Sequence, residues 1–180
     1  TLLSHRKLKW RKFLLKLQEL GFKSYSGCVC DVHIHINKDA LPKRKWKNFL
    51  LLVHILQGWL RRITNFRERH GSTFWTSEEI YEFLSGNIFG NNERKKIVNF
   101  QGNHNNTVEF RLFRGTLKPE RLKAYLQLTD AFVEFSRQNS YAYFYKHFQD
   151  NLIEITKQNL LSFAKRNGYQ QFLKLANGGC

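Results

Sequence analysis

Two histidines, a glutamate and an arginine stand out because they alternate with apolar residues in two short segments. In residues 30–36, Cys-Asp-Val-His-Ile-His-Ile, an extended strand would point His33 and His35 away from the side that carries the isoleucines. In residues 107–114, Thr-Val-Glu-Phe-Arg-Leu-Phe-Arg, the same alternation separates Glu109 and Arg111 from the apolar positions. If both strands lie in one sheet, these four side chains share its polar face.

This combination of side chains suits the binding of a metal ion or of phosphate groups. Neutral imidazole and carboxylate are metal ligands that two strands can bring together without backbone strain. An arginine two residues from such a carboxylate can hold phosphoryl oxygens that the metal also bridges, as phosphoryl transfer requires. Two simpler interpretations stay open: Glu109 and Arg111 form an exposed ion pair, and each histidine is an ordinary surface or core residue.

Helices are predicted on either side of the first strand. Residues 5–20 have the spacing of an amphipathic helix that ends at Gly21, and we expect this helix to lie across the sheet. The apolar positions of that helix are Trp10, Phe13, Leu14, Leu17 and Leu20. Residues 42–66 predict one long central helix, with Pro42 in its first turn.

The segment before the second strand predicts a short helix and a hairpin. Thr76 opens the capping-box sequence Thr-Ser-Glu-Glu, and the helix that it begins can end at Gly86. Residues 94–100 predict a strand. The Gly- and Asn-rich residues 102–106 then predict a hairpin turn into the strand that carries Glu109.

The whole pattern indicates an α+β domain that spans residues 1–180. After the second strand, residues 118–137 predict a helix, and residues 141–176 predict one or two more. We expect a mainly antiparallel sheet of three to five strands with helices packed on one face, the face of Val32 and Phe110. The opposite face would then carry the histidines, the glutamate and the arginine.

The charge of the chain is far from neutral. Its 180 residues contain 30 Lys and Arg against 14 Asp and Glu, a formal net charge of +16. Such a charge attracts anions, among them nucleic acid, nucleotides, acidic membranes and polyanionic substrates. The basic clusters are either solvated helix faces or a dedicated nucleic-acid surface, and the sequence leaves both open.

The cysteines and the apolar segments indicate the compartment. Cys28, Cys30 and Cys180 form neither a disulfide framework nor a zinc signature, so we expect free thiols, with the first two buried, in a reducing environment. The most apolar stretch, residues 49–60, is too short to span a bilayer. The expected localisation is therefore cytoplasmic, without a membrane partner.

At these residues the chain resembles a known family. Residues 27–36, Gly-Cys-Val-Cys-Asp-Val-His-Ile-His-Ile, and residues 107–117, Thr-Val-Glu-Phe-Arg-Leu-Phe-Arg-Gly-Thr-Leu, look like the two signature strands of the amidoligases. These are carboxylate–amine ligases related to glutamine synthetase and glutamate–cysteine ligase. The resemblance covers residues 27–135, the second motif is the more specific, and it implies a glutamine-synthetase-like catalytic sheet.

The resemblance also implies roles for five residues. His33 and Glu109 match the family's ligands to a magnesium or manganese ion, and His35 matches a histidine close to the nucleotide phosphates. Arg111 matches the catalytic arginine that contacts the transferred phosphoryl group of ATP. Arg114 is implied as a further catalytic contact to phosphate or substrate. The implied reaction is amide-bond formation, in which ATP phosphorylates a small-molecule or peptide carboxylate and an amine attacks the acyl phosphate.

One departure from the family concerns the start of the chain. Relatives of this kind carry an early G-x-E-x-E strand whose glutamates complete the metal site, and no such strand precedes His33 here. Before residue 27 the one acidic residue is Glu19, within a strongly basic helix. We therefore expect an N-terminally incomplete sheet, whose edge another copy or a partner chain would complete.

Two alternatives stay open. In the first, the chain is a catalytically incomplete amidoligase-like scaffold that uses its positive charge to bind nucleic acid or a protein partner. In the second, weaker one, it is a metal-dependent nuclease that uses His33, His35, Glu109 and His104. A hairpin turn explains the asparagines around His104 better than a nuclease motif does.

Overall fold

The computed structural model describes residues 10–24, 31–66, 73–86, 95–100 and 106–179. Within them, helices and a small antiparallel sheet form an α+β fold, which confirms the predicted fold class. Some predictions concern residues outside these ranges: the buried thiols of Cys28 and Cys30, the free Cys180, the nuclease role of His104 and most of the hairpin turn at 102–106.

The described sheet has three strands in the order β1-β3-β2. β1 (Asp31–Asn37) and β2 (Val98–Asn99) each pair antiparallel with the central strand β3 (Thr107–Arg114). The register places Glu109 opposite His35 on one side and opposite Asn99 on the other. A carboxylate in the middle of the sheet therefore has polar neighbours on both flanking strands.

A β-bulge interrupts the alternation predicted for β3. Two of its residues, Arg111 and Leu112, lie opposite the single residue His33 of β1. Beyond the bulge, the ring of Phe113 stacks on Tyr125 at a centroid distance of 4.6 Å. Strict alternation is thus wrong for the end of β3, because the extra residue lets Phe113 join the apolar side.

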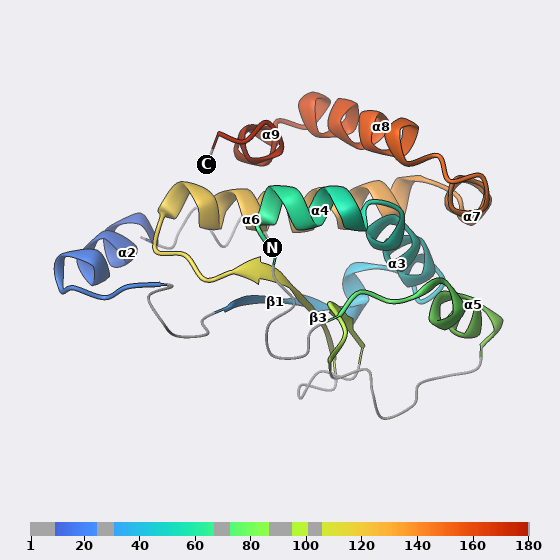
Figure 1. Ribbon diagram of the computed structural model, residues 1–180, viewed down its shortest axis with the longest axis horizontal. Helices are drawn as coiled ribbons and strands as arrows, with labels where there is room; N and C mark the ends of the chain where they lie inside the picture. Colours follow the sequence, from blue (N-terminus) through green and yellow to red (C-terminus); the bar gives the residue numbers. More distant parts are fainter. Residues whose placement is uncertain (1–9, 25–30, 67–72, 87–94, 101–105, 180) are drawn as a thin grey trace.

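Helices cover the apolar face of the sheet, as predicted (Figure 1). α3 (Lys45–Ile55) and α6 (Pro119–Gln138) both lie against β3. The ring of Phe110 is 5.4 Å from Phe49 of α3 and 6.5 Å from Phe132 of α6, between ring centroids. These fully buried aromatic rings form the centre of the core and fix which face of the sheet remains polar.

A second layer of helices lies on the far side of α6 from the sheet (Figure 1). It consists of α8 (Ile153–Arg166) and α9 (Gln170–Ala176), while α7 (Tyr141–Gln149), which precedes them, packs against α3. The sequence predicted one or two helices here, and the structure has three. The chain turns at Asn151 and Gly168, where φ is +52° and +75°, so neither position can continue a right-handed helix.

The long central helix predicted over residues 42–66 is two helices in the structure. α3 begins at Lys45, and α4 (Gln57–Thr64) follows after Leu56, which leaves helical geometry at φ −95° and ψ 8°. Figure 1 shows that the two helices run in different directions. After the break, α4 lies against β3 and its Leu60 is fully buried, a tertiary contact that the helical pattern does not reveal.

The first described helix, α2 (Trp10–Glu19), does not lie across the sheet as predicted. It lies beside the start of α6, where the Gln18 side chain donates a hydrogen bond to the Leu117 carbonyl oxygen at 2.6 Å. Leu14 is the buried residue of α2, whereas the side chain of Phe13 is 54 % exposed. The apolar face of the sheet is already occupied by α3 and α6, so α2 packs at its end.

Two shorter elements complete the description. The 3-10 turn η1 (Lys38–Ala40) follows β1, and α5 (Ser77–Ser85) begins with the predicted capping box of Thr76 and Glu79. Among the helices of the described residues, none combines the length and the apolar composition that crossing a bilayer demands.

Candidate functional site

Glu109 is the centre of the polar face of the sheet. Its carboxylate is 7 % exposed and contacts side chains from all three strands. Oε1 lies 2.8 Å from Nδ1 of His33, and Oε2 lies 2.9 Å from Nε of Arg111. Asn99 of β2 donates a hydrogen bond to Oε2 at 3.0 Å. The structure therefore brings together His33, Glu109 and Arg111, which the sequence placed on one face.

His35 lies at the edge of this cluster. Its Nε2 is 3.8 Å from Oε1 of Glu109, beyond hydrogen-bond distance, and its Nδ1 is 3.3 Å from the hydroxyl of Thr107. The side chains of His33 and His35 are 37 % and 39 % exposed, so both rings are accessible to a ligand. The two imidazoles and the arginine thus surround one buried carboxylate at an accessible surface.

The Glu109 carboxylate is ionised at neutral pH. Burial by itself raises the pKa of this group, because a charge is poorly solvated inside the protein. The contacts from Arg111 and Asn99, the positive charge of Arg111 and the nearby His33 outweigh that effect and hold the pKa below its usual 4.5. A fixed negative charge therefore lies beneath the two histidines and orients the groups that contact it.

Asn99 is the member of the cluster that sequence analysis missed. It lies in the two-residue strand β2, within the predicted strand at 94–100, and is 2 % exposed. The predicted strand could have pointed to it, because every second residue of a strand beside β3 faces the side of Glu109. The sequence does not fix the register of this strand, and the register selects Asn99.

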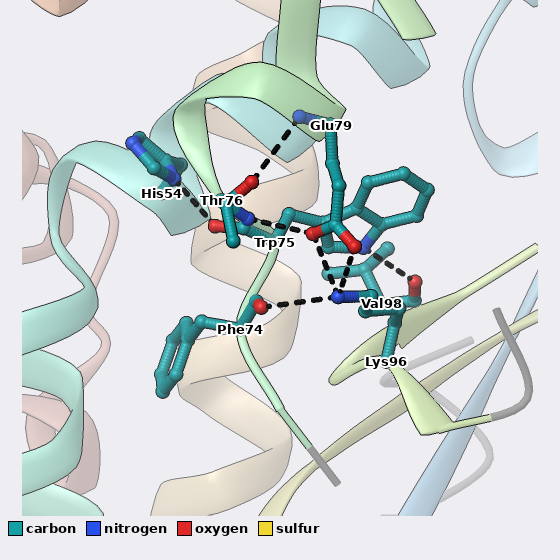
Figure 2. A network of polar contacts seen from close by, with 7 residues as sticks. All are labelled: His54, Phe74, Trp75, Thr76, Glu79, Lys96 and Val98. Atoms are coloured by element: carbon teal, nitrogen blue, oxygen red, sulfur yellow. Dashed lines mark hydrogen bonds and ion pairs between the residues drawn. The ribbon is translucent and has the colours of Figure 1, made fainter. Parts of the chain in front are cut away.

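The position of β2 depends on a polar network between the sheet and α5 (Figure 2). Nε1 of Trp75 donates to the Val98 carbonyl oxygen at 3.0 Å, and the buried Lys96 ammonium lies 2.6 Å from the Glu79 carboxylate. Glu79 also accepts a hydrogen bond from the Thr76 backbone, so one side chain caps α5 and pairs with Lys96. This network anchors the strand that delivers Asn99 to the site.

Arg114 lies apart from the Glu109 cluster. It is the last residue of β3, opposite Asp31 of β1 in the strand register. Together with Lys118 and Arg121 it lines a separate pocket at the start of α6. The structure thus separates the two predicted catalytic arginines, with Arg111 beside Glu109 and Arg114 at the end of the sheet.

The described residues do not form a ready metal site. Within those ranges no group of three or more His, Cys, Asp and Glu side chains is arranged to hold a metal ion. Both oxygens of Glu109 already have partners, one in His33 and the other in Arg111 and Asn99. A carboxylate that neutralises a guanidinium has little charge left for a divalent cation, so the metal-ligand roles of His33 and Glu109 stay predictions.

The arrangement is better suited to binding an anion. An arginine held by a buried carboxylate is a hydrogen-bond donor of the kind that contacts phosphoryl oxygens, and the exposed imidazoles add donors when they are protonated. Comparison with known proteins adds no relative: no protein-family model, curated protein or solved structure matches the chain.

Proposed function

We propose that the polar face around Glu109 binds the phosphoryl group of ATP in a carboxylate–amine ligase. The observation that carries this proposal is the convergence of His33, His35 and Arg111 on one buried, ionised carboxylate. The resemblance of the two strands to amidoligase motifs supplies the reaction class, and the geometry supports a site for phosphoryl oxygens.

The reaction would proceed in two steps. An oxygen of the substrate carboxylate attacks the γ-phosphorus of ATP, the bond to the leaving oxygen breaks, and acyl phosphate and ADP form. The nitrogen of the amine then attacks the acyl carbon and loses a proton, and inorganic phosphate leaves. Negative charge on the phosphoryl oxygens grows in the first step, so fixed donors and positive charge stabilise its transition state.

Each residue of the cluster has a defined part in this proposal. The contact between Nε and Glu109 holds the guanidinium of Arg111 in one orientation, which favours two-point contact with phosphoryl oxygens. His33 is oriented by the same carboxylate through Nδ1, and His35 lies beside it. Glu109 and Asn99 are positioning residues, because they act through the groups that they hold.

A hydroxamate assay tests the proposal. The full chain would be incubated with ATP, hydroxylamine and a panel of mono-, di- and polycarboxylic acids, in the presence and absence of magnesium or manganese. Hydroxylamine replaces the amine, so an acyl phosphate from any accepted acid gives a coloured iron–hydroxamate complex. We expect hydroxamate and ADP in equal amounts with at least one class of acid.

Two variants make this test specific. Arg111→Gln removes the proposed phosphoryl contact and is expected to lower the rate about a hundredfold. Arg166→Gln is the matched control, because it removes the same charge from the exposed end of α8. Absence of hydroxamate with every acid, or equal rates in the two variants, would contradict the proposal.

The high positive charge favours a second candidate function, the binding of nucleic acid by the same scaffold. A small acid and ATP do not require a net charge of +16. A basic surface releases counterions from phosphates, so this binding would weaken steeply with salt. It needs no intact catalytic cluster, so the Arg111→Gln variant separates the two candidates.

A further inference from the structure

A second polar pocket lies where α2 meets the loop between β3 and α6. Its volume is about 600 Å³, within the range of small-molecule sites. Arg114 comes from the end of β3, Lys23 from the segment after α2, and Lys118 and Arg121 from the start of α6. These segments are far apart in the sequence, so the pocket exists only in the folded chain.

The charge of the pocket has one sign. Four of the described residues that line it are Lys or Arg, and none of the described lining residues is Asp or Glu. The nearest acidic residues of α2 and α6 are already paired, since Glu19 contacts Lys16 at 3.1 Å and Glu120 contacts Arg11 at 3.7 Å. Asp31, opposite Arg114 in the strand register, is the carboxylate that remains close. Four lining cations, with no carboxylate among the described lining residues, favour an anionic ligand.

The walls of the pocket are tied together by specific contacts. The side chain of Gln18 donates to the Leu117 carbonyl oxygen at 2.6 Å and joins α2 to the loop. Within the loop, the Lys118 amide donates to the Thr116 hydroxyl at 3.1 Å. These contacts fix the spacing between the cations of α6 and Lys23 of the α2 side. A preset spacing lowers the entropic cost of binding a ligand with several charges.

An aromatic ring lies at the rim. Phe22 lines the pocket and is 60 % exposed. An exposed ring beside cations gives a flat surface on which a base or another planar group can stack.

We propose that this pocket binds a small ligand that carries several phosphate or carboxylate groups. Arg114 and Arg121 suit two-point contacts with such groups, and Lys23 and Lys118 add charge. The ligand lies outside the Glu109 cluster, so the inference goes beyond the proposed reaction and does not depend on it.

Isothermal titration of the full chain at physiological salt tests this site directly. Inorganic tripolyphosphate represents phosphate ligands, citrate represents carboxylate ligands, and ATP adds a base. We expect one molecule of tripolyphosphate or of citrate to bind per chain, and the preferred one identifies the chemistry. Tighter binding of ATP than of tripolyphosphate, abolished by Phe22→Ala, would identify a nucleotide.

Charge-matched double variants decide whether the binding is local. The variant Lys23→Gln/Lys118→Gln removes two pocket cations and is expected to weaken binding roughly tenfold or more. The variant Lys165→Gln/Arg166→Gln removes the same charge from exposed positions of α8 and is expected to change little. Circular dichroism is the control that shows whether both variants are folded.

Two results would overturn the proposal. One is the absence of heat with both anions at millimolar concentration. The other is equal weakening in the two double variants, because binding would then follow net charge and not this pocket. Neither result would contradict the proposed ligase function, because the hydroxamate assay tests Arg111 and not the residues of this pocket.

Discussion

A carboxylate that is 7 % exposed is stable in its charged form only if nearby groups compensate for lost hydration. For the Glu109 carboxylate, this compensation comes from contacts with Arg111, His33 and Asn99. Glu109→Gln keeps the size of the side chain but removes its charge, so Arg111 loses its counter-ion in a strongly basic protein. We expect the free energy of unfolding to fall by about 1–3 kcal/mol, measured by urea denaturation.

The result for Glu109→Gln is compared with Glu82→Gln, which removes a carboxylate from an exposed position of α5. An equal loss of stability in both variants would mean that only overall charge matters and that Glu109 has no special partners.

The lowered pKa of Glu109 adds a pH dependence with a definite sign. The folded protein holds this carboxyl below its usual pKa of 4.5, so the unfolded chain takes up the proton first as the pH falls. The stability that Glu109 contributes is complete above pH 4.5 and is lost as the pH falls through the folded pKa. Urea denaturation of the wild type and of Glu109→Gln should therefore give curves that converge in acid. A constant difference between them would contradict the lowered pKa.

The residues of the site could be predicted to different degrees. Alternation within each strand was enough to place His33, Glu109 and Arg111 on one face, because a strand has a fixed period of two. Asn99 could not be chosen, because its place depends on the register of a two-residue strand. Arg114 shows a further limit: its role is implied by the resemblance to the amidoligases, whereas the bulge and the end of the sheet decide where it lies.

At the scale of elements, the contact between α5 and β2 couples a helix cap to the site. Glu79 caps α5 and also pairs with Lys96, which is 8 % exposed (Figure 2). Glu79→Gln can keep the cap but leaves the ammonium of Lys96 without its counter-ion, at an expected cost of about 1–3 kcal/mol. Glu79→Ala also loses the hydrogen bond from the Thr76 backbone amide, whereas Thr76 still caps the helix, and should cost about 1 kcal/mol more.

Urea denaturation measures both costs, and the amide side-chain resonance of Asn99 shows whether the loss reaches the site. We expect this resonance to shift in both variants, since Lys96 and Asn99 belong to the same short segment. An unshifted resonance in a destabilised variant would show that the network supports α5 but does not position β2.

Helix boundaries were the least predictable feature of the elements. The capping box at Thr76 was correctly read, because its signal is local. The sequence did not predict the break at Leu56 or the position of α2, because both depend on which surfaces other helices already occupy. Local sequence therefore located the helices, while their division and docking followed from the packing of the whole domain.

Gly58 offers a test of the local contribution to α4. A Cβ atom built at this position meets nothing within 4 Å, and the backbone there is not in the left-handed region. Gly58→Ala should raise the free energy of unfolding by roughly 0.4–1 kcal/mol, because it restricts the unfolded chain. Gly168→Ala is the contrast, since at φ +75° the added Cβ is strained and should destabilise. Thermal unfolding measures both, and a loss of stability in Gly58→Ala would contradict the helical account.

At the scale of the whole molecule, two layers of helices on one side of a small sheet confine the candidate site to the other side (Figure 1). The fold class could be predicted, because alternating segments predict strands, amphipathic segments predict helices, and their order along the chain indicates an α+β domain. The net charge of +16 is the property that this architecture does not explain. A function of this charge would have to lie on the protein surface, where positive side chains attract polyanions.

Salt dependence separates a true polyanion surface from incidental charge. If the domain binds duplex DNA through Z phosphate contacts, the logarithm of its affinity should fall with the logarithm of salt concentration with a slope of about −0.9Z. Gel shifts with one duplex at several salt concentrations measure this slope. An excess of tripolyphosphate that releases the duplex would place the contact at the Arg114 pocket. Release by salt alone would place it on the helix surfaces, and an unshifted duplex at low salt would exclude nucleic acid and leave small anions as the ligands of this basic domain.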